Sequence, residues 1–471
     1  MADDPYSTSP TDLLSFSTDT VNLDTIISGK ATNTYTFEVY NPSKRALRLS
    51  SVALEKGTAS LFRVNVDGVF LEGGVATGLE IGAQDSLRVF LFVNAPATDS
   101  DEPVELSDNV VFTTEGGAVQ RVALRAYSQD VVTISESVIS RDTVLSARRP
   151  YVITDSLTVS EGCTLTLSPG VRLYFAPSAS LIVRGTLKAE GTPDARIQMR
   201  GDRLGYMFSQ QPYDRIPGQW GGVVLTKEST GNRLSWCDIH SGSFGIRVDS
   251  TGTDAEKLRL ENSVVHNVSG DGLNVRCAKV FVGNCQITNA GGNCVTLLGG
   301  SAEFVQCTIA NFYAFTGGRG CALSYANEDG TVRLPLEEAT FRNCLITGYS
   351  TDEIFGTQSA ANPDDAYNFL FENCLLNTSR VEDERIVRCL WDAKADTVEV
   401  WRETNFSPDF DLTTLTFSFQ LSEKSQARDN ADKSTANQYP LDLAGRSRMA
   451  DGKPDIGCFE FVAKEENAGE Q

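Results

Sequence analysis

Short runs of alternating apolar and polar residues fill the first quarter of the chain, for example Tyr35–Val39 and Leu87–Val93. A period of two places successive side chains on opposite faces, so these runs predict half-buried β-strands. Turn residues such as Asp67-Gly68 separate the runs, and no helical period of 3.6 residues intervenes. We therefore expect an Ig-like β-sandwich over residues 15–128, preceded by a flexible polar tether over residues 1–14.

A repeated unit dominates the rest of the chain: an apolar residue, Asn, then Cys or Ser, and another apolar residue. Six copies, the first degenerate, place at one position Cys237, Ser263, Cys285, Cys307, Cys344 and Cys374. The regular copies are 22 residues apart, from 263 to 285 to 307. Such a period predicts stacked coils of three short strands, with neighbouring coils about 4.8 Å apart. Residues 129–461 should form a parallel β-helix, followed by a polar tail over 462–471.

Two columns of side chains follow from this register. The Asn position tolerates the left-handed backbone of a tight turn, and we expect an internal ladder of Asn262, Asn284, Asn343 and Asn373, with Gln306 as a near substitute. The neighbouring Cys or Ser column should be a narrow interior row of small buried residues. A thiol metal or redox site is the alternative, although the paired close spacing of zinc ligands is absent. A leucine-rich repeat shares the period but needs a denser Leu framework.

Further motifs carry a family resemblance. They are the stretch from Leu157 to Pro193, Gly201–Leu204, Pro217–Gly222, Asp442–Arg446 and Asp455–Glu460. With them the chain resembles bacterial pectin-lyase-like surface proteins, a subgroup of which are outer-membrane lipoproteins of the Bacteroidota. The resemblance implies an all-β chain with a leading Ig-like domain and a right-handed, single-stranded parallel β-helix. It also implies a closing coil at the last two motifs, although Cys458 stands where the family has a small residue, often Ala.

Composition narrows the possible partners. The 62 Asp and Glu outnumber the 41 Lys and Arg, and the net charge of −21 disfavours nucleic acid and anionic lipid. No apolar run is long enough for a membrane span, and the first residues lack the regions of a signal peptide. The polar start resembles a tether that follows a removed signal sequence, so we expect a secreted or outer-membrane surface protein, with a lipid anchor on its precursor. The 11 cysteines are an odd number and do not indicate a disulfide framework.

The sequence lacks the catalytic motifs of β-helix enzymes. Neither Gly-His-Gly nor Arg-Ile-Lys occurs, and no column of acids suggests a Ca²⁺-dependent lyase. We therefore expect no catalytic residue, no metal and no cofactor. The two histidines, His240 and His266, occupy the same coil position and should stack about 4.8 Å apart on a tolerant outer turn. This pattern favours a structural pair, with a metal or acid–base site as the alternative.

Loop insertions provide the functional hypothesis. The insertions near residues 311–337 and 348–368 lie in consecutive coils, after Ile309 and Ile346, and should project side by side. Their candidate ligand-binding residues are Tyr313, Phe315, Arg319, Tyr325, Tyr349, Asp352, Asp364, Asp365 and Tyr367. Aromatic rings, acids and an Arg suit a glycan or a protein surface. The alternative is that the aromatic residues cover a small core of the insertions themselves.

These observations predict a non-enzymatic cell-surface protein that binds a glycan or a surface protein, or serves as a scaffold. A polysaccharide lyase or glycoside hydrolase, with acids such as Asp352 and Asp364 as its chemistry, is the first alternative. An accessory subunit that associates with an outer-membrane β-barrel is the second.

Overall fold

The computed structural model describes residues 6–135, 137–208, 211–392, 405–406 and 416–463. The chain divides into two compact units, residues 1–132 with 204–212, and residues 133–203 with 213–471. Nearly all regular structure in the described ranges is β-strand. The exceptions there are the helix α2 (Lys433–Ala436) and three 3-10 turns, η1 (Gly57–Ala59), η2 (Glu72–Gly74) and η3 (Tyr213–Arg215).

The first unit is a two-sheet β-sandwich. One sheet has the order β1 (Ser15–Phe16), β3 (Tyr35–Tyr40), β9 (Ser86–Val93), β5 (Phe62–Val66), β6 (Val69–Phe70). The other has β2 (Thr20–Ile27), β11 (Val119–Gln129), β10 (Val104–Thr114), β4 (Leu47–Leu54), β7 (Val75–Ala76), with β8 (Leu79–Ile81) beside β4. The predicted alternation is seen in β9, where Val89 and Leu91 are fully buried and Phe90 is exposed. The prediction of a two-sheet β-sandwich is confirmed, and its Ig-like character stays a prediction.

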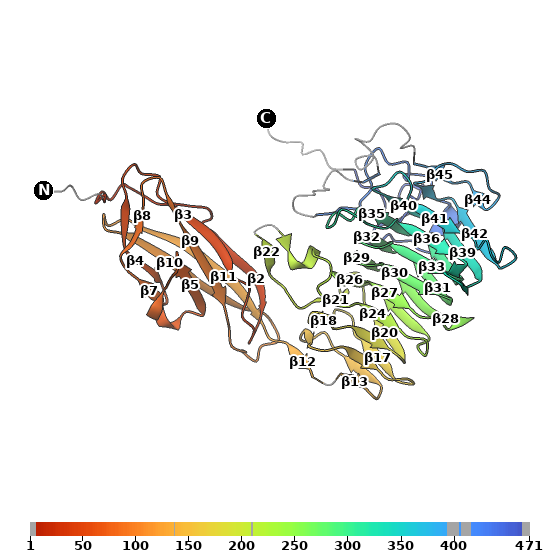
Figure 1. Ribbon diagram of the computed structural model, residues 1–471, viewed down its shortest axis with the longest axis horizontal. Helices are drawn as coiled ribbons and strands as arrows, with labels where there is room; N and C mark the ends of the chain where they lie inside the picture. The colour runs from red at the N-terminus through yellow and green to blue at the C-terminus, as the bar shows by residue number, and fades with distance from the viewer. Residues whose placement is uncertain (1–5, 136, 209–210, 393–404, 407–415, 464–471) are drawn as a thin grey trace. The chain divides into compact units, whose positions relative to one another are not determined.

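The second unit is a parallel β-helix whose coils stack one on the next (Figure 1). Its first sheet contains β12 (Val132–Ile134), β15 (Tyr151–Ile153), β18 (Arg172–Phe175), β21 (Ile197–Gly201), β26 (Cys237–His240), β29 (Val264–Val268), β32 (Gln286–Ala290), β35 (Thr308–Asn311), β40 (Leu345–Gly348), β43 (Leu375–Leu376) and β45 (Leu390–Trp391).

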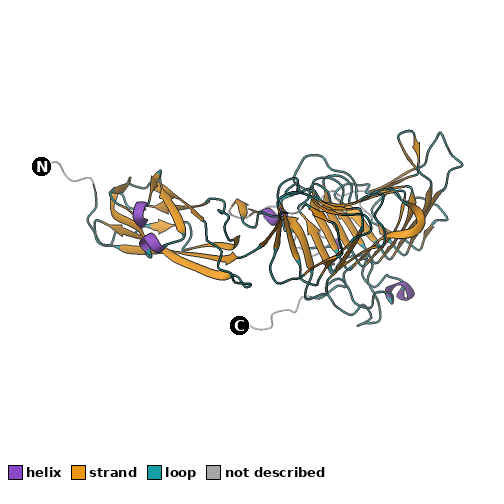
Figure 2. Ribbon diagram, turned by 90° about the horizontal axis from the view of Figure 1, so that it is seen from below, coloured by secondary structure: helices purple, strands orange, loops and turns teal. Residues whose placement is uncertain are grey.

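The second and third sheets complete each coil, and Figure 2 shows the resulting ladders of strands. The second sheet contains β13 (Val138–Ile139), β16 (Leu157–Val159), β19 (Leu181–Val183), β24 (Val223–Leu225), β27 (Ile246–Val248), β30 (Leu273–Arg276), β33 (Val295–Leu298), β36 (Leu323–Ala326) and β41 (Ile354–Thr357). The third contains β14 (Thr143–Leu145), β17 (Thr164–Leu167), β20 (Thr186–Glu190), β25 (Asn232–Ser235), β28 (Gly252–Glu261), β31 (Ala278–Gly283), β34 (Gly300–Val305), β39 (Leu336–Arg342), β42 (Tyr367–Glu372) and β44 (Ile386–Val387). Two hairpins lie outside them, β22 (Tyr206–Phe208) with β23 (Gln211–Pro212) and β37 (Glu328–Asp329) with β38 (Val332–Arg333).

The interior of the β-helix follows the repeat register. The Cys column is fully buried, and all 11 cysteines are free thiols. Each of the column's thiols donates to a carbonyl, as Cys285 Sγ does to Gly283 O at 3.2 Å. Beside this column, the rings of Phe304, Phe341 and Phe371 stack coil on coil with centroids 4.9 Å apart. The prediction that cysteine acts here as a small buried residue is confirmed.

The Asn column has the predicted backbone but not the predicted partners. Asn262, Asn284, Gln306, Asn343 and Asn373 all have φ between 49° and 53°. Asn284 donates to Asn262 at 2.7 Å, yet Gln306 donates to the carbonyl oxygens of Asp455 and Gly457 at 3.0 Å. The expected internal ladder of amide-to-amide hydrogen bonds is therefore mostly absent from this column. The amides point outward at a coil corner and bind mainly the C-terminal segment.

The C-terminal segment, defined as residues 416–461, does not form the expected closing coil. Its apolar residues Leu443, Ile456 and Phe459 pack against Leu345 and Leu375, which point outward from the first sheet. This contact is the core of a separate cluster outside the coils. The segment's motifs serve to hold it there, because the Asp442 carboxylate accepts bonds from the backbone N–H groups of residues 444, 446 and 460 at 2.7–2.9 Å. The motif that resembles a last coil is thus a cover on the outer surface of the first sheet.

Candidate functional site

The outward surface of the first sheet carries the histidine pair. His240 and His266 are direct neighbours in the register of β26 and β29, and their ring centroids lie 4.9 Å apart. The predicted stack is confirmed. The expected tolerant outer turn is wrong, because His240 and the next residues of the column, Thr288 and Ala310, are buried. Segments from outside the coils cover this column of the first sheet. The repeat spacing does not indicate such covering segments.

Two carboxylates surround His240. Asp238 Oδ1 lies 2.9 Å from His240 Nδ1 and 3.2 Å from His266 Nε2. Asp214 Oδ1 lies 2.8 Å from His240 Nε2 and also forms an ion pair with Arg200. We call these five residues the acid–histidine cluster. Every member belongs to the β-helix unit.

The cluster is deep at one end and open at the other. The side chains of His240 and Arg200 are 3% and 8% exposed, whereas those of Asp214, Asp238 and His266 are 42%, 32% and 26% exposed. The open side therefore presents two carboxylates and one imidazole to solvent. A small ion or a polar substituent can reach these groups without any change in the coils.

Mutual charge interactions shift the ionisation of the cluster. Burial opposes protonation of His240, but the charges and hydrogen bonds of Asp238 and Asp214 outweigh it and raise its pKa to about 9. Burial also opposes ionisation of Asp214, yet His240 and Arg200 lower its pKa to about 2. The pKa of Asp238 lies well below its usual range for the same reason, since both histidines face it. In the absence of another cation, His240 is a charged imidazolium between two carboxylates.

Buried neighbours hold the cluster in place. Trp220 is completely buried, stacks on Phe175 with centroids 4.4 Å apart, and donates its indole N–H to His240 O at 2.8 Å. Asp214 lies in η3, and the carbonyl of the next residue, Arg215, accepts from Asn267 at 3.2 Å. The Trp220-Gly221-Gly222 motif thus fixes the backbone of β26 and contributes to the position of His240.

Sequence reasoning missed Asp214, Asp238 and Arg200. A signal for Asp238 existed, because it lies two residues before His240 in one strand and so shares its face. No local signal marks Asp214, which reaches the sheet from the long connection between β21 and β24. Chemically, the cluster can hold a divalent cation, since atoms of Asp238, His240 and His266 all lie within 4.8 Å of one another. Carboxylates beside imidazoles are also suited to acid–base chemistry.

The predicted insertions are divided between two corners of the coils. In one coil, residues 312–322 connect β35 to β36, and residues 327–335 connect β36 to β39. In the next coil the corresponding connections are residues 349–353 and 358–366. The expectation that all the extra residues follow Ile309 and Ile346 is therefore wrong, although the paired connections do lie side by side. Arg319 donates to Ser350 at 3.1 Å at the first corner, and Arg333 forms an ion pair with Asp365 at the second.

The first corner contains part of the predicted ligand-binding set. The guanidinium of Arg319 lies over the Tyr349 ring, 4.7 Å from its centroid, and Tyr349 is 39% exposed. Phe315 contacts Tyr313, with centroids 5.1 Å apart, but Tyr313 is only 4% exposed. Asp352 is partly exposed. Residues 312–322 and 349–353, which we call the corner loops, thus expose only part of that set.

A buried acid holds the two corner loops together. Glu353 is completely buried and accepts backbone hydrogen bonds from Ser350 at 2.6 Å and Ala322 at 2.8 Å. Its backbone N–H donates to Asn377 O at 2.9 Å in the following coil. The corner loops are therefore tied to each other and to the coil below.

Other predicted residues lie elsewhere. Tyr325 takes the inward place of Leu297 in the register and is 6% exposed. Tyr367 stacks on it, with centroids 5.7 Å apart, so both rings belong to the interior. Asp365 is paired with Arg333, and Asp364 is exposed beside it. The rings of Tyr325 and Tyr367 therefore cover a core, which was the alternative to a role in ligand binding.

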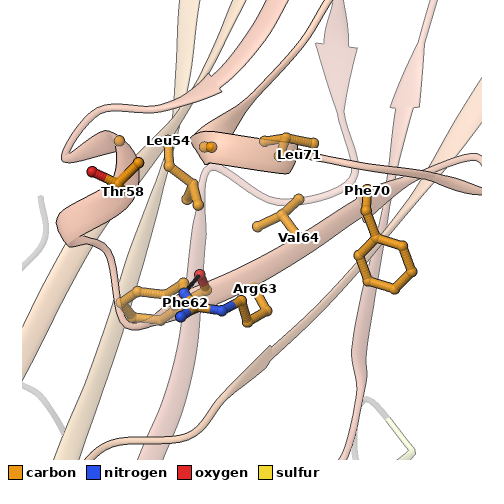
Figure 3. A pocket seen from close by; sticks show the side chains of 10 residues that line it. Leu54, Thr58, Phe62, Arg63, Val64, Phe70 and Leu71 are labelled. Atoms are coloured by element: carbon orange, nitrogen blue, oxygen red, sulfur yellow. Dashed lines mark hydrogen bonds between the residues drawn. The ribbon is translucent and has the colours of Figure 1, made fainter.

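The sandwich contains a pocket of a different kind. It has a volume of about 250 Å³ and lies between the η1 and η2 turns and β5. Figure 3 shows its lining side chains Leu54, Thr58, Phe62, Arg63, Val64, Phe70 and Leu71. Arg63 is its one ionisable residue, and its guanidinium donates to the carbonyls of Ser60 and Phe62. The pocket thus lacks a partner acid or base for catalysis.

Comparisons with known proteins define the class of the second unit. Residues 221–380 match the family model of the right handed beta helix region, so this unit is a right-handed parallel β-helix. A segment of 122 residues is 30% identical to the protein bark beetle of Drosophila melanogaster and covers 22% of this chain but only 4% of that protein.

Two solved structures match this chain at low similarity. A GH87 α-1,3-glucanase from Streptomyces thermodiastaticus is 14% identical, with 73% of this chain and 74% of that chain covered and a TM-score of 0.30. A pectin methylesterase from Aspergillus niger is 15% identical, with coverages of 64% and 97% and a TM-score of 0.24. Likenesses of this degree carry no argument about activity. The β-helix is a fold on which carbohydrate-active enzymes and binding proteins both occur.

No helix in the described ranges combines the length and apolar character that a membrane crossing requires.

Proposed function

We propose that this protein is a non-catalytic glycan-binding protein of the bacterial cell surface, attached to the outer membrane or secreted, and that the corner loops bind the glycan. The observation that carries the proposal is the exposed Tyr349 ring beside Arg319, on loops fixed by the buried Glu353. Aromatic rings supply contact area for sugar faces, and polar groups orient the hydroxyls. The rigid corner reduces the entropic cost of binding.

Binding to a glycan array, followed by titration of the best glycan, tests this proposal. The Tyr349→Ala variant should lose most of the affinity while its unfolding transition stays unchanged. Tyr127→Ala is the matched control, because Tyr127 is a ring of the sandwich with 38% exposure against 39% for Tyr349. Equal binding by Tyr349→Ala, Arg319→Ala and the parent protein would refute the assignment of the corner loops.

A polysaccharide lyase or glycoside hydrolase is the second candidate, and the acid–histidine cluster favours it. Asp214 and Asp238 place two carboxylates on either side of one imidazole, with an opening to solvent. The chemistry would thus lie here instead of at Asp352 and Asp364. Release of reducing or unsaturated products from acidic and neutral polysaccharides, abolished in Asp238→Asn, would decide for this candidate.

A further inference from the structure

The acid–histidine cluster has the donor set of a transition-metal site. Asp238, His240 and His266 offer one carboxylate oxygen and two imidazole nitrogens within 4.8 Å of one another. Two imidazoles and one carboxylate, with further positions open, suit zinc and its first-row neighbours. Calcium and magnesium prefer sites built mainly from oxygen ligands.

The distances are close to those of a coordinated ion. Bonds of about 2.0–2.1 Å in a tetrahedral zinc site place ligand atoms about 3.3 Å apart. Asp238 Oδ1 lies 2.9 Å from His240 Nδ1 and 3.2 Å from His266 Nε2. The two imidazole nitrogens lie within 4.8 Å of each other, and rotation of the partly exposed His266 ring can shorten this distance. Asp238 and His266 are 32% and 26% exposed, so water can supply a further ligand to an ion held by the three residues.

The groups behind the three ligands have the arrangement that orients metal-bound histidines. His240 presents Nδ1 to the ligand side, and its Nε2 is bonded to Asp214 at 2.8 Å. Arg200 in turn forms an ion pair with Asp214, and Trp220 holds the His240 backbone. A carboxylate on the second nitrogen fixes the tautomer of a coordinating imidazole and increases its basicity.

We propose that Asp238, His240 and His266 form a zinc-class metal site on the outward surface of the first sheet, with Asp214 as a positioning residue. The site goes beyond glycan binding by the corner loops and does not depend on it. The thiols do not compete inside the coils, because the Cys column is buried and faces the interior.

Isothermal titration of the chelator-treated full chain with zinc chloride tests the proposal, together with NMR of the imidazole carbon-bound protons. The chain has only 2 His, and both lie in the cluster, so every imidazole signal reports on this site. We expect one zinc per chain and shifts of both imidazole signals. Asp214→Asn should weaken zinc binding about 10- to 100-fold, and His266→Gln should weaken it more.

Asp329→Asn is the matched control, because Asp329 is an exposed acid paired with Arg276 outside the cluster. It should leave zinc affinity unchanged. Heat of binding without a shift of either imidazole signal would place zinc outside the cluster, for example on the partly exposed thiols Cys163, Cys277 or Cys389, and overturn the proposal. No binding at excess zinc would overturn it as well. The NMR measurement on the unmodified chain remains decisive even where a variant fails to fold.

Discussion

The outward surface of the first sheet has two parts with opposite character. Near β26 and β29 it carries the acid–histidine cluster, whose acids remain 32% and 42% exposed. Near β35, β40 and β43 it carries Ala310, Leu345 and Leu375, which are completely buried in a cluster that includes the C-terminal segment. The two groups of strands belong to one sheet, with only β32 between them, and their inward positions are alike. The difference shows that the covering segment, and not the coil, decides which part of a β-helix can meet a ligand.

The largest effect on stability should come from the buried ion pair in the C-terminal segment, which covers part of the first sheet. Arg448 is fully buried, pairs with Glu460 at 2.7 Å and donates to Asn284 at 2.6 Å. Arg448→Met leaves a buried carboxylate without its cation, so above pH 7 the free energy of unfolding should fall by about 3–5 kcal/mol. Chemical denaturation measures it, and the double variant with Glu460→Gln should recover part of the loss. A loss below about 1 kcal/mol would mean that the pair does not hold the cover.

The apolar contact should have a smaller effect. Leu345→Ala removes a fully buried side chain between β40 and the C-terminal segment, and should reduce the free energy of unfolding by about 2–3 kcal/mol. Leu441→Ala is the matched control in the same segment, because Leu441 is 47% exposed, and it should change stability by less than about 0.5 kcal/mol. Equal effects of the two substitutions would contradict a sealed cover.

The cover should also weaken as the pH rises. Burial raises the pKa of Glu460 from 4.5 to about 7, so between these values the native protein retains a proton that the unfolded chain has lost. The free energy of unfolding should therefore decrease with rising pH across this window, by about 1–3 kcal/mol from this group. Denaturation at several pH values measures the slope. Glu460→Gln should flatten it, and an unchanged slope in that variant would reject Glu460 as its source.

A substitution in the open acid–histidine cluster should change the stability of the protein least. Asp214→Asn removes the charge that faces His240 and Arg200, but its side chain is 42% exposed and water can replace part of the lost interaction. We expect a loss of about 0.5–1 kcal/mol in the thermal or denaturant transition of the metal-free protein. A loss as large as that of Arg448→Met would show that the cluster is a structural lock instead of an open site.

The interior was predictable because the repeat specifies it directly. In stacked coils each residue has the same neighbours as its counterpart one period away, so Cys285 predicts the burial of Cys307, and His240 predicts the position of His266. The same register could have placed Tyr325 inside, since it stands opposite Leu297. The aromatic character of Tyr325 and Tyr367 suggested binding residues, but their positions in the strand register place both rings against the interior.

The candidate site was only half predictable. The histidine stack and the side shared by Asp238 follow from strand geometry. Asp214 reaches His240 from a non-repeating connection, and no period relates it to the sheet. Arg200 lies in the neighbouring strand β21 and forms an ion pair with Asp214.

The sequence alone determined the β-sandwich, the coils, the buried Cys column and the histidine stack. These features depend on periods of two and of about 22 residues, which act between neighbours in a strand or in adjacent coils. Only the tertiary structure decided that the Asn column binds the C-terminal segment and that Asp214 reaches His240 on the side opposite Asp238. Those contacts join residues far apart in the chain, as Gln306 and Asp455 are, and depend on which surface a non-repeating segment covers.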